Sequence, residues 1–212
     1  MNSERDEICH CLGSTFIGES LKQLSQLYDQ IEEETSVFCE KYQIHCQDGC
    51  GTCCEHFMPD ITVLEARMVA AYLVLVKKDL LLIDKVQNSD QPFCPLYEGN
   101  NPHHCTVYAA RPLVCRLFGA CASRNKNGIA EFRRCRFNEG ETMPEHLIFS
   151  PEVRGMDDYG IQLRSLETGT DQVADLDEAV SNSLGEVRMI CSFIDNDDNN
   201  DDDTLTPNPL AS

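Results

Sequence analysis

Cysteine is the residue type in this sequence with the clearest chemical potential. The 212-residue chain contains 13 cysteines, and nine of them fall between residues 46 and 135. Cys50-Gly51-Thr52-Cys53-Cys54 places three thiols side by side, and its glycine gives the backbone freedom to curl around an ion. Thiolates held this close repel one another, and a bound metal or inorganic cluster removes that cost by neutralising them. The pattern therefore predicts metal ligation, in preference to buried thiols that act as small hydrophobic side chains.

Seven cysteines are the predicted metal ligands. They are Cys46, Cys50, Cys53, Cys54, Cys94, Cys105 and Cys115. Seven thiolates exceed what one tetrahedral zinc ion can use, so two zinc sites, or one four-thiolate iron–sulfur cluster with spare thiols, would each account for them. The second half of the set has widely spaced single cysteines instead of a second short pair. This spacing favours an iron–sulfur cluster of the 4Fe-4S type over zinc, and zinc remains the alternative cofactor.

The spacing of these cysteines also carries a family resemblance. The double cysteine, Cys94-Pro-Leu and the run Cys105-Thr-Val-Tyr-Ala-Ala-Arg-Pro-Leu-Val-Cys115-Arg resemble the CxxCxxCC proteins, also called YkgJ-like, over roughly residues 44–136. These proteins are described as zinc- or iron-chelating. The same motif is more distantly similar to flagellin lysine-N-methylase, which implies an iron–sulfur cluster. The first interval, C-x3-C from Cys46 to Cys50, departs from the C-x2-C of the family.

Two arginines of this motif are predicted to bind the cofactor. Arg111 and Arg116 bracket Cys115 and would surround an anionic thiolate site with positive charge. They begin a basic segment, residues 111–136, with a net charge of +6 in a chain whose net charge is −19. A solvated surface is the ordinary explanation of such a run and stays open beside this one. Pro112 would leave Cys115 in the first turn of a helix, where the helix dipole favours a thiolate.

Composition and charge narrow the classes of partner. Hydrophobic and charged contents of 42% and 25% fit one globular domain, while the acidic charge argues against binding to nucleic acid or an anionic membrane. The most apolar run, residues 68–76, is far shorter than the roughly 20 residues of a membrane span. The N-terminal segment has no apolar signal-peptide core, so we expect a cytoplasmic protein in which clustered cysteines bind metal instead of forming disulfides.

The elements that must position the cysteines are predicted to be mainly helical. Helices are expected at about residues 15–42 with Ser14 as N-cap, from the capping box Thr62-Val-Leu-Glu65 through Ile83, at residues 112–119, and at about residues 171–194. Prolines in the segment 87–106 oppose a helix or a central strand there. The expected fold class is mainly α, with helices around irregular metal-bound cysteine-rich loops and little or no sheet.

Four parts of the chain are expected. Residues 1–43 form an N-terminal arm and helix, with residues 1–13 as a mobile arm. Residues 44–140 form the metal-binding domain, and residues 141–194 form a helical extension. Residues 195–212, which are rich in Asp and Asn, form a disordered acidic tail because they cannot bury apolar area.

Three functions are compatible with this pattern. The first is a redox or metal-handling protein that holds an iron–sulfur cluster. The second is a zinc-stabilised interaction module whose acidic tail meets a basic protein partner. The third is a cluster-dependent group-transfer enzyme, methylase-like by resemblance alone. The sequence has no glycine-rich nucleotide loop, nucleophile elbow or paired-carboxylate signature, so no catalytic residue is assigned.

Overall fold

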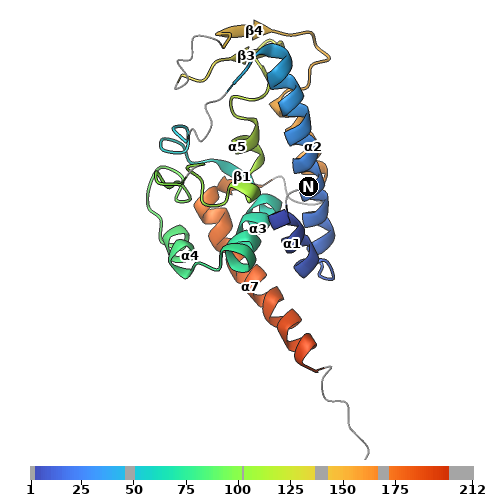
Figure 1. The fold of residues 1–212 in the computed structure, drawn as a ribbon, viewed down its shortest axis with the longest axis vertical. Coiled ribbons are helices and arrows are strands. Elements are labelled where there is room, and N and C mark those ends of the chain that lie inside the picture. The colour runs from blue at the N-terminus through green and yellow to red at the C-terminus, as the bar shows by residue number, and fades with distance from the viewer. Residues whose placement is uncertain (1–2, 46–50, 102, 137–142, 167–171, 201–212) are drawn as a thin grey trace, which may run out of the picture.

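The protein is built mainly from helices, as the computed structural model shows (Figure 1). The model describes residues 3–45, 51–101, 103–136, 143–166 and 172–200, with side chains described as far as Ile194. Helices account for 54% of the structure and strands for 11%. This confirms the predicted fold class, a mainly α protein with little sheet.

The order of elements mixes long helices with very short strands. The helices are α1 (Ser3–Leu12), α2 (Gly18–Tyr42), α3 (Val63–Ala71), η1 (Tyr72–Lys77), α4 (Leu80–Gln87), η2 (Tyr108–Ala110), α5 (Leu113–Leu117), α6 (Met156–Ser165) and α7 (Leu176–Asn200). The strands are β1 (Asp60–Thr62), β2 (Ser123–Arg124), β3 (Ala130–Arg133), β4 (His146–Ile148) and β5 (Val173–Asp175).

Helix α3 is the centre of the hydrophobic core and packs against α2 and α7. Strands β1 and β5 lead directly into α3 and α7 and pair antiparallel, with Ile61 opposite Ala174. This pairing starts the two helices from adjacent positions. One buried cluster includes residues of α1 to α7, so the N-terminal helices, the cysteine-containing segment and the C-terminal helix share a single core.

Residues 3–12 form a packed helix, so the prediction of a mobile arm over residues 1–13 is wrong for the part of that segment that the structure describes. Helix α1 buries Arg5, Ile8 and Leu12 completely, and these positions lie on one face of a helix. The predicted N-cap Ser14 is also wrong, because α2 begins at Gly18 and its N-cap position, Ile17, makes no side-chain bond.

A buried cation explains why α1 docks where it does. The Arg5 guanidinium is 0% exposed and forms ion pairs with Asp29 and Glu32 of α2. It also donates to the Ser25 hydroxyl (3.2 Å) and to the Ala109 carbonyl (2.9 Å). A buried arginine is tolerated when its donors are satisfied in this way. Arg5 therefore joins α1, α2 and the segment before α5.

The predicted capping box at Thr62 is confirmed. The Thr62 hydroxyl accepts from the Glu65 amide, and the Glu65 carboxylate accepts from the Thr62 amide. The helix does not continue unbroken to Ile83, however. It widens into the π-helix η1 and stops at Lys78, which has a left-handed φ of 54°, before Asp79 caps α4.

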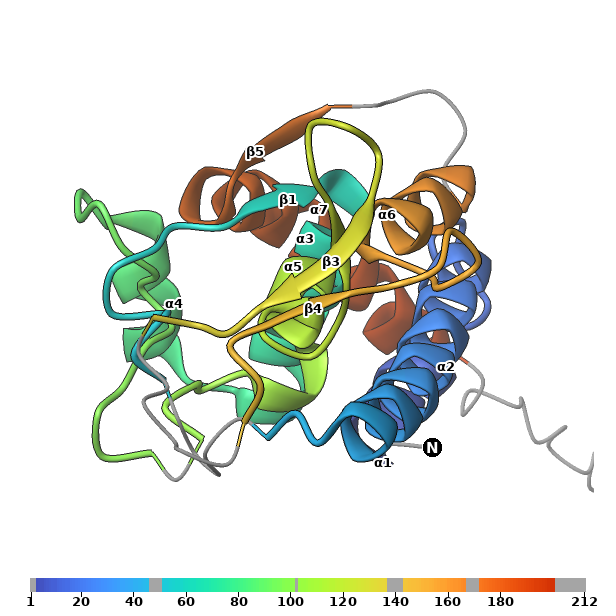
Figure 2. The same cartoon turned by 90° about the horizontal axis from the view of Figure 1, so that it is seen from above.

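A three-stranded antiparallel sheet, in the order β2-β3-β4, covers the end of the molecule above α5 (Figures 1 and 2). These three strands are a small addition to a fold that was expected to have little or no sheet. Helix α7 runs to Asn200, past the expected end at Ile194, and most of the predicted acidic tail, residues 201–212, lies outside the described residues. In the part of the chain that is described, no helix combines the length and apolar character needed to cross a bilayer.

Replacing Arg5 tests whether the first helix is integral to the fold. We expect Arg5→Met to lower the free energy of unfolding by about 2–3 kcal/mol, because it leaves buried acceptors without donors while Asp29 and Glu32 regain partial hydration. Urea titration followed by circular dichroism measures the change. Arg133→Met is the matched control: the Arg133 side chain is 68% exposed and its described ion pair is with Glu131, so its loss should leave the free energy of unfolding close to the wild-type value. Equal losses in both variants would contradict this role of Arg5.

Candidate metal centre

Five of the seven predicted ligands line one cavity. Cys53 and Cys54 reach it from the turn after residue 51, Cys94 and Cys105 from the irregular segment between α4 and η2, and Cys115 from α5. The cavity has a volume of about 80 Å³, several times the roughly 10–15 Å³ that one water molecule needs. The structure brings together thiols that are distant in the sequence. Cys46 and Cys50 lie outside the described residues.

A close approach of two backbones shapes the double-cysteine turn. A Cβ atom on Gly51 would lie 2.1 Å from His104 Cβ, so a larger residue does not fit at position 51. The His104 ring stacks on Tyr97, and Tyr97 pairs with Cys105 in an isolated antiparallel bridge. The turn that contains Cys53 and Cys54 is thereby packed against the segment that contains Cys105. Gly51 is a steric requirement of this contact.

A buried carboxylate fixes the position of α5 and hence of Cys115. Glu65 is 3% exposed, and its Oε1 accepts a hydrogen bond of 2.7 Å from the amide of Leu113, the first residue of α5. The Tyr28 hydroxyl donates to the same oxygen at 3.5 Å. Burial raises the pKa of Glu65, and these hydrogen bonds oppose that shift. One side chain therefore caps both its own helix and the helix that carries a predicted ligand.

The pKa values of the two adjacent cysteines are shifted in opposite directions. Their sulfur atoms are 3.9 Å apart. The hydrogen bond between the two sulfur atoms, helped by backbone amides and by the charge of Arg111, lowers the pKa of Cys53. The same hydrogen bond, together with burial and the negative charge of Cys53, raises the pKa of Cys54 far above its usual value. Cys53 is therefore the more acidic thiol of the pair.

The other three thiols are protonated at neutral pH in the metal-free protein. Burial raises the pKa of Cys94 to about 11, and it also raises the pKa of Cys105. Burial and the charges of neighbouring cysteines raise the pKa of Cys115. The predicted dipole stabilisation of a Cys115 thiolate is therefore outweighed, because α5 has only five residues and desolvation of the half-buried cysteine raises its pKa. A cation in the cavity would reverse this balance.

The two predicted cofactor-binding arginines have different surroundings. Arg111 lines the cavity, and its charge lowers the pKa values of both Cys53 and Cys105. Arg116 is 4% exposed and donates to the carbonyls of Arg111 (2.8 Å) and Ala109 (2.6 Å). Its guanidinium also pairs with Glu32 and packs 3.9 Å from the Tyr28 ring centroid. Arg116 thus anchors the backbone of the motif to α2 and is not among the described residues that line the cavity.

Other arginines of the basic segment are engaged in ion pairs. Arg124 pairs with Asp158, Arg133 with Glu131, and Arg134 with Glu145. These pairs fit the solvated-surface explanation for that part of the segment.

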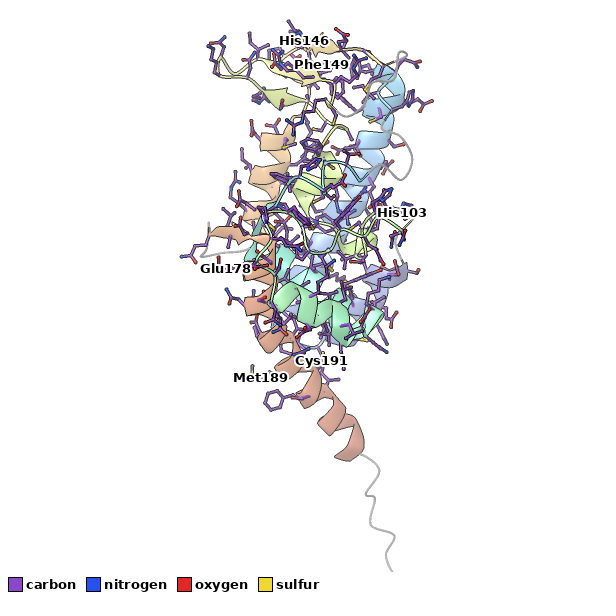
Figure 3. The ribbon with its side chains drawn as sticks, turned by 90° about the vertical axis from the view of Figure 1, so that its left-hand side faces the viewer. His103, His146, Phe149, Glu178, Met189 and Cys191 are labelled. Atoms are coloured by element: carbon purple, nitrogen blue, oxygen red, sulfur yellow. The ribbon has the colours of Figure 1, made fainter. Side chains whose placement is uncertain are left out.

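Aromatic side chains that the sequence analysis did not assign surround the mouth of the cavity. Phe57, Tyr108 and Phe118 all line it and are 44%, 39% and 45% exposed. His103, which lies in the loop shown in Figure 3, stacks on Tyr108 at the same mouth. Spacing of cysteines carries no signal for these residues. Because these aromatic lining residues are partly exposed, the cavity is open to other molecules on an apolar side.

The donor set fits a soft metal centre. Thiolates select zinc, copper(I) and iron–sulfur clusters. Among the described residues, no three His, Cys, Asp or Glu side chains lie close enough together to hold a single metal ion. The thiols instead surround a space. The buried Nε atom of Arg111, which lines this space, has no hydrogen-bond partner within the described ranges, so the site has donor capacity that the protein alone does not use.

Thiols from separate segments around one cavity define a metal-binding class of site. Residues 45–141 match the model of the CxxCxxCC family, "Putative zinc- or iron-chelating domain", in agreement with the resemblance predicted from the cysteine spacing. The match supports metal binding by this segment. No curated protein and no solved structure matches the chain, so the similarity to flagellin lysine-N-methylase is not shown.

Gly51 provides a test of the turn geometry. We expect Gly51→Ala to bind less metal, because its Cβ would push the double-cysteine turn away from His104. Gly185→Ala is the matched control: no atom lies within 4 Å of its added Cβ, and alanine should stabilise the interior of α7 by up to about 1 kcal/mol. Metal analysis of both purified variants measures the effect. Full metal content in Gly51→Ala would show that the close contact is dispensable.

Metal binding should release protons, because the raised thiol pKa values keep Cys94, Cys105 and Cys115 protonated in the metal-free protein. Ligation needs thiolates, so the apparent affinity for the metal should increase as the pH is raised from about 6.5 to about 8.5. Titration of the apoprotein with zinc in weak buffer, with a pH indicator, measures the released protons. An affinity that does not change with pH would mean that the ligands are already ionised.

Proposed function

We propose that this protein holds an iron–sulfur cluster of the 4Fe-4S type in the cysteine-lined cavity and acts in electron transfer or metal handling. The observation that carries the proposal is the arrangement of Cys53, Cys54, Cys94, Cys105 and Cys115 around one space. A cluster presents iron corners several ångströms apart, so its ligands surround it. A single zinc ion needs ligands that converge on one point.

The surroundings of the individual thiols favour some of them as the four ligands. The five described thiols exceed four, and Cys46 and Cys50 are further candidates outside the described residues. The buried Cys94 and the well-anchored Cys115 are the strongest ligands, because each is fixed by its surroundings. Cys94 is 8% exposed, and Cys115 sits on the helix capped by Glu65. The other two ligands come from Cys53, Cys54 and Cys105, so the adjacent pair Cys53 and Cys54 contributes at least one of them.

A second candidate function is group-transfer catalysis at the cluster. The open, aromatic mouth of the cavity favours it, because a centre that is purely structural needs no access for other molecules. A small apolar compound that perturbs the cluster's absorption in the wild type, but not in Phe118→Ala, would support this function. A zinc-stabilised interaction module is the remaining alternative, and the metal content of the purified protein distinguishes it from a protein that holds an iron–sulfur cluster.

The cysteine assignment is tested by two variants. We expect anaerobically purified wild type to contain about four iron and four sulfide per chain and to absorb in the visible range. Cys94→Ser should lose most of both. Cys191→Ser should keep them, because Cys191, labelled in Figure 3, lies on α7 and is not among the described residues that line the cavity. Iron, zinc and acid-labile sulfide analysis, with gel filtration to check folding, measures the outcome.

Three results would each revise a different part of the assignment. Colourless wild type with one or two zinc ions per chain would replace the cluster with zinc. Equal iron in both cysteine variants would remove Cys94 from the ligand set. Wild type without any metal would refute the proposed function itself.

A further inference from the structure

A stack of three side chains leads from the cavity mouth towards the thiols. The His103 and Tyr108 rings are stacked with centroids 4.2 Å apart, and the Arg111 guanidinium carbon lies 4.0 Å from the Tyr108 centroid. Two groups cannot share one face of a ring at these distances without overlap. Tyr108 is therefore held between His103 and Arg111, and all three line the cavity.

The stack leaves Arg111 with unused hydrogen-bonding capacity. Its Nε atom is buried and has no acceptor among the described residues. A buried donor without a partner costs about 1–3 kcal/mol, so such a group in a stable fold requires an explanation. Arg116 offers a contrast five positions later, since its described contacts are two backbone carbonyls and the Glu32 carboxylate. The unsatisfied arginine is the one that faces the cysteines.

We propose that Arg111 Nε donates a hydrogen bond to the bound metal centre, to a sulfide or a ligand thiolate, and that Tyr108 is the positioning residue that holds the guanidinium there. This inference rests on the proposed function. Stacking on Tyr108 restricts the rotamers of a long side chain, so less entropy is lost when the hydrogen bond forms. The positive charge then stabilises the more negative, reduced state of a cluster.

A structural role for Arg111 predicts different behaviour. An arginine that only fills space on Tyr108 could be replaced by methionine, which keeps an apolar stem of similar length, without a change in the electronic properties of the centre. A hydrogen-bond donor could not. The midpoint potential separates these roles, because it responds directly to charge and hydrogen-bond donors at the cluster.

The experiment compares the midpoint potentials of wild type and five variants at equal iron content. Arg111→Met should lower the equilibrium constant for one-electron reduction about tenfold, which is a shift of about 59 mV to more negative potential. Arg111→Lys should recover part of the shift, because lysine restores charge without the planar donors. Tyr108→Leu should shift in the same direction by less. Tyr108→Phe, which keeps the ring, and the surface control Arg133→Met should match wild type.

Each outcome is decisive. Wild-type potential in Arg111→Met overturns the proposal, and wild-type potential in Tyr108→Leu alone overturns the role of Tyr108. If wild type contains zinc and no iron, the proposed cluster is refuted, and Arg111 is then tested by the rate at which a chelator removes zinc. Release several-fold faster from Arg111→Met than from Arg133→Met would support the hydrogen bond to a thiolate, and equal rates would overturn it.

Discussion

Two buried guanidinium groups that share the same acceptors hold this structure together. Arg5 and Arg116 both donate to the Ala109 carbonyl and both pair with Glu32. Burying two cations side by side is costly unless every donor is satisfied, and here the acceptors come from α2 and from the backbone just before α5. The Tyr28 ring, close to both arginines, completes the anchor. The first helices are thereby as much a part of the metal centre's support as the cysteine-containing segment itself.

Local signals in the sequence predicted the elements whose cause is local. The capping box at Thr62 and the short helix between Pro112 and Gly119 were both correct, because each depends on a few neighbouring residues. The packed α1 was missed because an isolated arginine on a short helix resembles a solvated residue until its partners in α2 are known. The end of α3 was missed for a related reason: an apolar stripe records which residues are buried, and it does not record that the helix widens and turns at Lys78.

In the candidate site, too, the sequence predicted features with a local cause and missed features that depend on tertiary packing. Five of the seven cysteines selected by their spacing line one cavity, and their role as ligands stays a prediction. Cysteine spacing could not separate the roles of Arg111 and Arg116, which have the same chemistry and lie in the same motif. It also could not identify Glu65, whose contact with Leu113 joins positions far apart in sequence, or the aromatic residues at the cavity mouth. Those assignments depend on tertiary packing, which the spacing of one residue type does not encode.

The wall of the cavity is completed by Leu176, the first residue of α7, whose amide donates to the carbonyl of Pro59, another lining residue. During translation the cysteines leave the ribosome well before this leucine does. The growing chain therefore carries its thiols beside an unfinished cavity until α7 docks on α3. A chain that ended before α7 would therefore present these cysteines and lack the part of the wall that Leu176 supplies.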